Sequence, residues 1–230
     1  MITVASYNIR KTIGTDRKRS PDRTIEVLNE LGADVIALLE ADLRFGARVS
    51  AIPMHLLEEH SDYRHIPLEG RIGIGWHGNA LLVRKHIRVL AADQLHIPAL
   101  EPRGAVLAEL DTDHGGLCVV GMHLDLSGLW RRRQAHAILA HVEGRPQRRP
   151  VVMMGDLNEW SARGGCLRDF GNHFTFADCG RSFHARRPIA RLDRIMVSRE
   201  VRIVESGVHA SALARQASDH LPIWAKISLR

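Results

Sequence analysis

The sequence is poor in cysteine and in aromatic residues, which make up 5% of its 230 residues. Its three cysteines, Cys118, Cys166 and Cys179, are odd in number and lack CxxC spacing, which argues against a disulfide framework and against a zinc site built from thiolates. We therefore expect a reducing compartment and a cytoplasmic protein. The four tryptophans are too scattered to predict a surface on which bases stack.

Long hydrophobic runs are missing as well. No run approaches the length that spans a bilayer, and the first residues show no basic segment ahead of an apolar stretch. We therefore expect no transmembrane segment and no targeting signal. Hydrophobic side chains make up 45% and charged ones 25%, a globular balance, and the length favours one domain over residues 1–230.

Acidic residues are fewer than basic ones, 26 against 32, which gives a formal net charge of +6. This charge favours attraction to a polyanion, and nucleic acid, anionic lipid and phosphorylated metabolites all fit. Two arginine-rich segments, residues 131–133 and 145–149, could follow a nucleic-acid backbone, although such runs are more often solvated faces. The oligomeric state stays open.

Residues that typically start and stop helices predict a helix between two strands in the first forty positions. Ser20 and Pro21 are typical of a helix start, apolar residues follow at helical spacing, and Gly32 is a stop. Residues 35–39 form a short apolar run, as in a strand covered on both faces. Other strands are expected at residues 2–5, 80–83, 87–90, 105–110, 117–122, 151–154, 192–197, 201–208 and 222–227, and other helices at residues 53–60 and 129–142. Many strands with few helices predict two packed sheets with helices outside.

Polar side chains stand at the ends of these predicted strands, where burial of an unpaired carboxylate would be costly. They are Asn8, Glu40, His123, Asp156, Asn158, Asp193, Asp219 and His220. If the strand ends converge, the oxygen atoms form an acidic pocket that suits Mg²⁺ or Mn²⁺ better than zinc. Imidazole and amide groups beside such an ion suit metal-assisted hydrolysis of a phosphate ester.

A serine-histidine-aspartate site for acyl transfer is the competing interpretation. The sequence has no Gly-x-Ser-x-Gly elbow, and Ser218, Asp219 and His220 are adjacent in the chain. Both observations favour the metal-dependent alternative.

Seven short motifs together resemble the endonuclease/exonuclease/phosphatase superfamily, in the order of that superfamily and over almost the whole chain. They are Ser-Tyr-Asn8-Ile-Arg, Ala-Leu-Leu-Glu40, Gly78-Asn79-Ala80-Leu-Leu-Val, Gly-Met-His123, Gly-Asp156-Leu-Asn158, Arg-Leu-Asp193-Arg-Ile and Ser-Asp219-His220-Leu-Pro. The resemblance implies an α/β fold, a four-layer α/β/β/α sandwich of two mixed, largely antiparallel sheets, with the site at one end.

The resemblance also implies roles for the matching residues. Glu40 is expected to be the principal metal ligand, and Asn8 to help place the phosphate or the water on the metal. Asp156 is expected to orient or deprotonate the attacking water, and Asn158 to donate to the scissile phosphate.

The remaining roles concern contacts to the phosphate and support of the metal. His220 is expected to contact phosphoryl oxygens with its tautomer set by Asp193, and Asp219 to support the metal. Where some abasic-site nucleases carry a second acid this chain has Arg10, which resembles the pancreatic deoxyribonuclease pattern and puts a second metal in doubt. His123 replaces a tyrosine of the repair enzymes and is a candidate phosphate contact or leaving-group acid.

Three further positions have weaker signals. Asn79 either orients a neighbouring site residue or closes a turn, and Asp125 is either a site residue or a turn acid. Arg187, in the segment before Asp193, is expected to lie at the rim of the pocket and bind a substrate phosphate.

We therefore expect a Mg²⁺-dependent or Mn²⁺-dependent phosphodiester hydrolase, with an endonuclease or exonuclease as the first expectation. A phosphoesterase that acts on phospholipids or small molecules, as in the sphingomyelinase and inositol-phosphatase branches, is the alternative, because 230 residues leave little room for the long insertions that grip DNA. A catalytically silent binding module is disfavoured, since clustered carboxylates would repel a polyanion.

Overall fold

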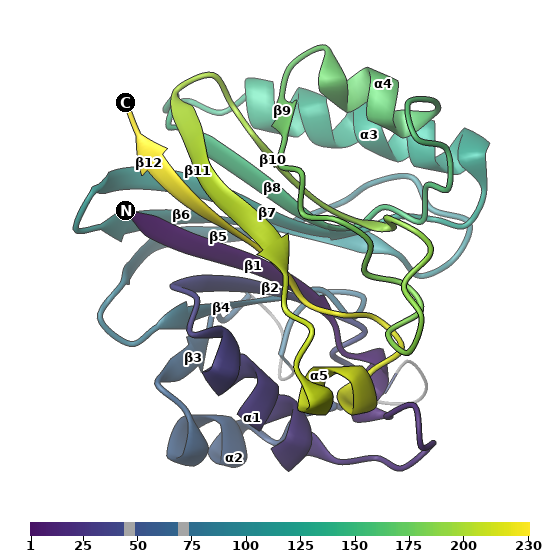
Figure 1. Cartoon of the computed structure of the whole chain (residues 1–230). Helices are drawn as coiled ribbons and strands as arrows, with labels where there is room; N and C mark the ends of the chain where they lie inside the picture. Colours follow the sequence, from purple (N-terminus) through teal and green to yellow (C-terminus); the bar gives the residue numbers. More distant parts are fainter. Residues whose placement is uncertain (44–48, 69–73) are drawn as a thin grey trace.

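Two six-stranded sheets pack face to face in the computed structural model, which describes residues 1–43, 49–68 and 74–230 (Figure 1). The first sheet contains β1 (Ile2–Asn8), β2 (Val35–Leu39), β3 (Tyr63–His65), β4 (Ala80–Arg84), β11 (Val201–Val208) and β12 (Ile223–Leu229), in the order β11-β12-β1-β2-β4-β3. The second contains β5 (Arg88–Leu95), β6 (Gly104–Thr112), β7 (Gly115–His123), β8 (Val151–Asp156), β9 (Thr175–Phe176) and β10 (Asp193–Val197), in the order β5-β6-β7-β8-β10-β9.

Each sheet contains one parallel pair in an otherwise antiparallel arrangement. β1 pairs in parallel with β2, and β7 pairs in parallel with β8. Every other strand pair in the described part of the chain is antiparallel. The prediction of two mixed, largely antiparallel sheets is confirmed, and the two parallel pairs decide where the site lies.

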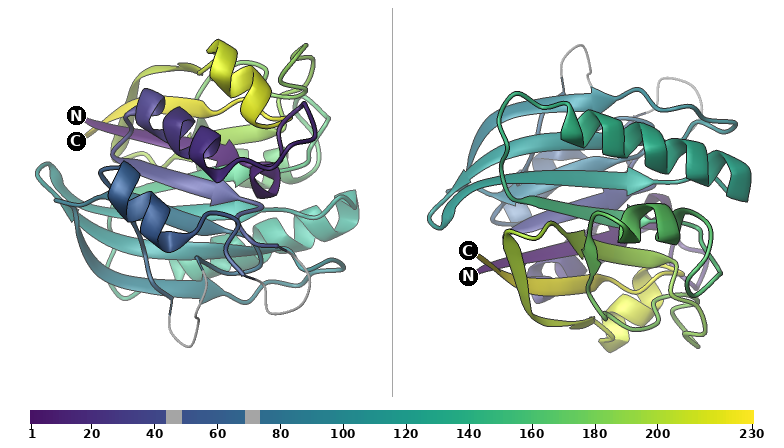
Figure 2. Two further views of the ribbon diagram at one scale, coloured as in Figure 1. Left: turned by 90° about the horizontal axis from the view of Figure 1, so that it is seen from below. Right: turned by 90° about the horizontal axis from the view of Figure 1, so that it is seen from above.

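Helices cover both outer faces, which confirms the four layers (Figures 1 and 2). The outer face of the first sheet packs against α1 (Pro21–Leu31), α2 (Met54–His60) and α5 (Ala212–Ala217). The outer face of the second packs against α3 (Gly128–Glu143) and α4 (Cys166–Gly171). The helix α1 begins as predicted, because Ser20 accepts a hydrogen bond from the Arg23 backbone N–H at 3.3 Å, and it ends at Gly32 in the left-handed region.

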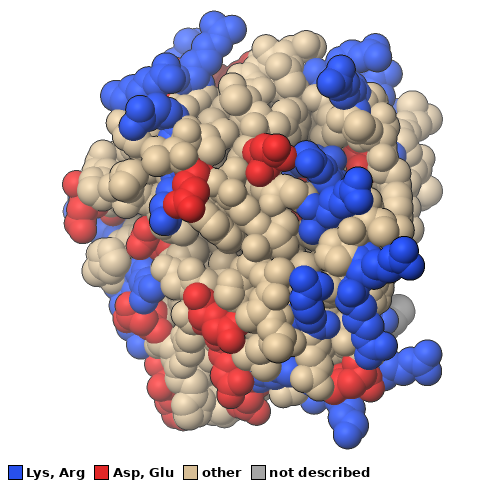
Figure 3. Space-filling model, in the orientation of Figure 1, with Lys and Arg blue, Asp and Glu red and all other residues tan. Residues whose placement is uncertain are grey.

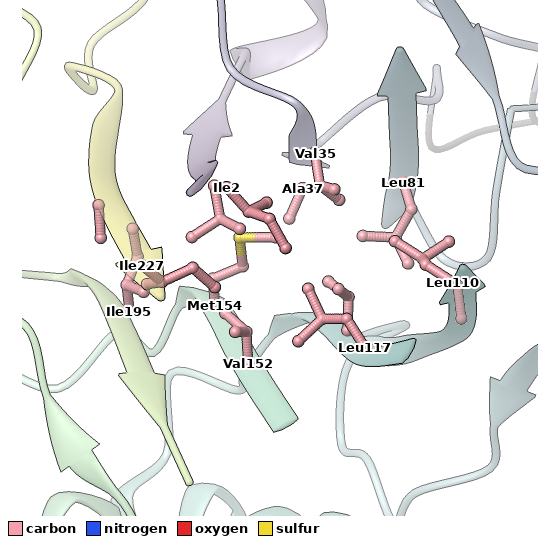
Figure 4. Packing of buried hydrophobic residues seen from close by; sticks show 14 of the residues in the cluster. Ile2, Val35, Ala37, Leu81, Leu110, Leu117, Val152, Met154, Ile195 and Ile227 are labelled. Atoms are coloured by element: carbon pink, nitrogen blue, oxygen red, sulfur yellow. The ribbon is translucent and has the colours of Figure 1, made fainter. Parts of the chain in front are cut away.

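The space between the sheets is filled by aliphatic side chains from both (Figure 4). Leu81 of the first sheet faces Leu110 of the second, Ile2 of the first sheet lies above Met154 of the second, and all four are buried. At Gly121 the second sheet lies close to the first, because an added Cβ would lie 3.2 Å from the Ala37 Cβ. Because no side chain fits at this position, the two sheets can pack closely here.

Short elements escaped the sequence-based prediction. β3, β9, α4, α5 and a 3₁₀ turn η1 (Arg10–Thr12) were not expected, whereas the helices at residues 53–60 and 129–142 are confirmed as α2 and α3. The helix α4 has Gly165 before its first residue and no side-chain cap, so the sequence offers no start signal there. In the described residues, no helix is both long enough and apolar enough to traverse a bilayer.

Part of the arginine-rich sequence serves the fold. Arg131 is buried and lies 3.1 Å from Glu159, while Arg145 and Arg149 both pair with Glu109 at the base of the second sheet. These arginines are therefore committed to ion pairs inside the protein. The three cysteines are free and buried.

Candidate active site

The carboxyl ends of the two parallel pairs meet at one end of the sandwich, on the side toward which β1 runs in Figure 1. Asn8 is the last residue of β1, and Glu40 follows β2 directly. His123 ends β7 and pairs in register with Asp156, which ends β8. Both chain termini lie at the opposite end (Figures 1 and 2).

Antiparallel neighbours bring the beginnings of two later strands to the same place. Asp193 starts β10 and pairs in register with Asp156. His220 lies three residues before β12, the antiparallel neighbour of β1. Predicted site residues from distant parts of the sequence thus gather at one end of the two sheets.

Asp156 is the centre of this group and is buried. Its Oδ2 accepts a hydrogen bond from Asn8 Nδ2 at 3.1 Å and lies 3.4 Å from His123 Nε2 and 3.8 Å from His220 Nε2. Its Oδ1 accepts the backbone N–H of Asn158 at 2.9 Å. One carboxylate therefore touches side chains from both sheets.

His220 and Asp193 form a buried pair. The Nδ1 of His220 lies 2.8 Å from the Asp193 Oδ2, which also accepts the Ser182 hydroxyl. Burial lowers the pKa of His220, but the charges of Asp193 and Asp156 outweigh it and raise the pKa to about 10. His220 is therefore an imidazolium at neutral pH, and its Nε2 faces Asp156.

Glu40 faces a cation of the chain itself. It lies in the left-handed region, at φ 54°, and its Oε2 contacts the ammonium of Lys11. Burial raises the pKa of Glu40, but Lys11 and the more distant charges of Arg103 and His220 bring it below its usual value. Glu40 is thus ionised and matched by positive charge.

Arg10 and Lys11 belong to a strained turn next to the site. Arg10, Lys11 and Thr12 have φ values of 46°, 56° and 61°, a region that residues other than glycine rarely adopt. The Arg10 backbone N–H donates to Asn8 Oδ1 at 3.1 Å, and its Nε lies 3.3 Å from Asp219 Oδ2. The turn therefore aims two cations at Glu40 and Asp219, and strain of this kind is typical of functional sites.

These residues fit a divalent cation. The carboxylate oxygens of Asp156 and Asp193 lie within 4.8 Å of each other, and Asp193 Oδ1 is buried without a hydrogen-bond partner among the described residues. His220, as an imidazolium, offers no ligand atom and adds a hydrogen-bond donor beside them. Glu40 and Asp219, the two predicted ligands, offer carboxylate oxygens that contact Lys11 and Arg10. Hard oxygen donors of this kind suit Mg²⁺ or Mn²⁺.

Sequence reasoning missed Arg103, a cation of the same site. Its Nη1 lies 2.7 Å from His123 Nδ1, because Gly104 of β6 pairs with His123 and sets the preceding residue beside the histidine. Asp125 supports the segment that leads to Arg103, since its Oδ2 accepts the backbone N–H groups of Leu100 and Glu101 at 3.1 and 3.2 Å. Asp125 acts here as a turn acid, one of its two expected roles.

Lys11, Glu40, Arg103 and His123 line one pocket at the mouth of the site. Two cations, one carboxylate and one imidazole converge there, which suits a phosphate bound next to a metal ion. The sequence does not predict that Lys11 and Arg103 belong to the site, because neither lies at the end of a predicted strand.

The remaining predicted residues lie around this group. Asn79 closes the turn before β4 by donating to Trp76 O at 3.0 Å, and its Oδ1 is buried without a described partner. Asn158 donates its side-chain amide to Leu124 O at 2.9 Å. Arg187 is exposed, and its backbone N–H donates to His184 O at 2.8 Å. The roles assigned to these three side chains stay predictions.

Comparison with known proteins agrees with this architecture. Residues 5–220 match the model of the endonuclease/exonuclease/phosphatase family. The protein YbhP of Escherichia coli K12 is 28% identical over 170 residues, which cover 67% of this chain. The chain spans 64% of the length of that relative.

Solved structures share the fold at low sequence identity. The mannosyl-6-phosphatase Bt3783 of Bacteroides thetaiotaomicron superposes with a TM-score of 0.77 at 18% identity, with full coverage of both chains. The D. rerio TDP2 complexed with a single-strand DNA product gives a TM-score of 0.76 at 17% identity, covering 99% of this chain and 98% of that one. At these identities the likeness concerns the fold.

Proposed function

Because the chain belongs to the endonuclease/exonuclease/phosphatase family, and is thereby a metal-dependent hydrolase of phosphate esters, we propose that it cleaves phosphodiesters by attack of water on phosphorus. The observation that carries this proposal is the position of Asp156. Its carboxylate lies within 3.8 Å of Asn8, His123 and His220, on the ends of strands from both sheets.

The contacts of Asp156 and His220 support a proton acceptor and a hydrogen-bond donor beside one reacting phosphate. In the proposed reaction Asp156 accepts a proton from the attacking water while the new oxygen–phosphorus bond forms. His220, held as the imidazolium by Asp193, donates a hydrogen bond to a phosphoryl oxygen, where negative charge grows in the transition state. His123, with Nδ1 beside the Arg103 guanidinium and Nε2 toward Asp156, is proposed as a second contact to the phosphate, and the leaving oxygen takes its proton from solvent as its bond to phosphorus breaks.

A divalent cation held by Glu40 and Asp219, with the side-chain oxygen of Asn8 beside it, would supply the positive charge that polarises the phosphate. Lys11 and Arg103 add charge from the chain at the same mouth. In the proposed role these two side chains bind the non-bridging oxygens and orient the ester. Magnesium or manganese is the ion that the donor set favours.

Nucleic acid is the first substrate that we propose, as endonuclease or exonuclease. The net charge of +6 favours a polyanion, and a protein of the same fold, TDP2, has been seen with a single-strand DNA product. A phospholipid or small phosphoester is the second candidate. Exposed apolar side chains beside the site favour it, and another neighbour in fold is a mannosyl-6-phosphatase. The free, buried cysteines are consistent with the proposed cytoplasmic location.

The test is hydrolysis by the purified protein of plasmid, abasic duplex, RNA, phospholipid and bis-p-nitrophenyl phosphate, with Mg²⁺, with Mn²⁺ and with chelator. We expect metal-dependent cleavage that falls at least about a hundredfold in Asp156→Asn. Asp62→Asn is the matched control, because Asp62 is half-exposed and pairs with Arg84 at 3.1 Å on the far side of β4. No cleavage of any phosphodiester, or equal cleavage by both variants, would refute the proposal.

A further inference from the structure

Four of the nine large apolar side chains that are exposed in the described part of the chain belong to segments next to the site. Leu126, Leu129 and Ile189 each expose 60% of their surface, and Trp160 exposes 64%. We call these four side chains the apolar rim. Exposed apolar side chains that gather beside a functional site mark an interaction surface rather than chance exposure.

The first half of the rim is held together by a buried arginine. Arg131 donates to the carbonyl of Leu126 at 2.6 Å and pairs with Glu159 at 3.1 Å. Glu159 directly precedes Trp160, so the start of α3 and the segment after β8 are fastened to each other. Leu126, Leu129 and Trp160 are thus presented by one rigid unit.

Aromatic contacts join the second half of the rim to the reacting groups. The ring centroid of Trp160 lies 6.0 Å from that of Phe183, and the Phe183 ring lies 4.9 Å from the imidazole of His220. The Ile189 backbone N–H donates to Phe183 O at 2.7 Å. The rim therefore continues from α3 to the histidine of the site.

The segments that carry the rim are basic and contain no acidic residue. Residues 126–133, 160–164 and 181–191 include eight arginines and neither Asp nor Glu. Arg131, Arg132 and Arg191 pair with acidic residues outside these segments, and the other five are exposed: Arg133, Arg163, Arg181, Arg186 and Arg187. Figure 3 shows Lys and Arg side chains along the side of the molecule toward which β1 runs, and a second group at the upper left. A surface with apolar side chains among cations matches an anionic bilayer, in which chains insert between headgroups and arginines meet phosphates.

We propose that the apolar rim and its arginines dock the enzyme onto an anionic phospholipid bilayer. The docked enzyme turns the mouth with Glu40, Asp156 and His220 toward the headgroup phosphodiesters. Single-stranded nucleic acid fits less well, because three of the four rim side chains are aliphatic and have no π face on which a base can stack. The headgroup as substrate rests on the proposed function, whereas the docking itself does not.

The docking test measures binding in chelator, so that hydrolysis plays no part. Flotation with vesicles of phosphatidylcholine, with and without phosphatidylglycerol, is expected to show binding that needs the anionic lipid and weakens with salt. Replacing three rim residues together, L129S, W160S and I189S, is expected to weaken partition at least about tenfold, because each loses apolar insertion. Trp160→Phe, a mild change, is expected to reduce the blue shift of tryptophan emission on vesicle addition, with Trp130 of the same surface still contributing.

Matched variants separate the docking from folding and from catalysis. Leu90 and Val204 are exposed on β5 and β11 toward the opposite end, so Leu90→Ser with Val204→Ser should leave partition unchanged. Asp156→Asn should bind vesicles like the native protein even though hydrolysis is lost, so a failure of the proposed chemistry and a failure of docking give different results. Equal partition by rim and control variants overturns the inference. So does absence of vesicle binding, or binding of a single-stranded oligonucleotide alone that the rim changes abolish.

Discussion

Replacing Glu159 by glutamine tests how strongly the buried ion pair behind the site stabilises the fold. The side chains of Arg131 and Glu159 expose only 10% and 7% of their surface, and two guanidinium nitrogens of Arg131 lie 3.1 and 3.3 Å from Glu159 Oε2. Glu159→Gln leaves a buried guanidinium without its counter-charge. Breaking one partner of such a pair costs about 3–5 kcal/mol, far more than an exposed pair contributes.

Urea unfolding followed by circular dichroism measures this cost, and a loss near 4 kcal/mol would lower the melting temperature by roughly 8–16 °C for a chain of this size. Arg88→Gln is the control, because Arg88 and Asp111 expose 71% and 41% of their side chains and an exposed pair is worth about 1 kcal/mol or less. The reasoning is refuted if both variants lose the same stability. Replacing both Arg131 and Glu159 by apolar residues should recover much of the loss, since no unpaired charge is then buried.

Three other substitutions give independent predictions. Asp193→Asn should bring the pKa of His220 from about 10 toward 6.5, and an NMR titration in chelator measures this change. Because the pKa is raised in the native protein, His220 stabilises the fold below pH 6.5, and this contribution is lost as pH rises through 10. An unchanged titration would contradict the pairing of His220 with Asp193. Hydrogen bonds from Ser211 and His209 lower the pKa of the half-exposed Glu30, so part of the loss of stability in acid comes from its protonation. In Glu30→Gln the free energy of unfolding should therefore fall less below about pH 4.5, by under about 1 kcal/mol. A larger fall in the variant would contradict this. Gly155→Ala should lower the free energy of unfolding by about 3 kcal/mol and displace Asp156, because the alanine Cβ would lie 1.8 Å from the Met122 carbonyl oxygen. A variant as stable as the native protein in thermal unfolding would show that the backbone can move.

The sequence predicts the layers of this fold because its signals are local. Ser20 and Gly32 mark the two ends of α1, and alternating or fully apolar runs mark the long strands. The motif residues lie at strand ends, so the direction of each strand is enough to bring Asn8, Asp156 and His220 to one end of the molecule. These predictions need only the period of the pattern and the pairing of strands.

Residues whose place depends on pairing across the fold were not predictable in this way. Arg103 reaches His123 because β6 and β7 pair in a particular register, and no local pattern encodes that register. Lys11 contacts Glu40 through a turn with positive φ angles, which non-glycine residues rarely adopt. The helix α4 was also missed, because no side chain caps its start and its buried residues are held by packing against the second sheet.

The pairing of β12 with β1 determines when the protein can become active during its synthesis. Asn8 belongs to β1, whereas His220 precedes a strand that must lie beside β1 and is made more than two hundred residues later. A nascent chain that has formed only its early strands holds Glu40 without the imidazole opposite. Such a chain has an incomplete site, because the pair of His220 with Asp193 is still missing.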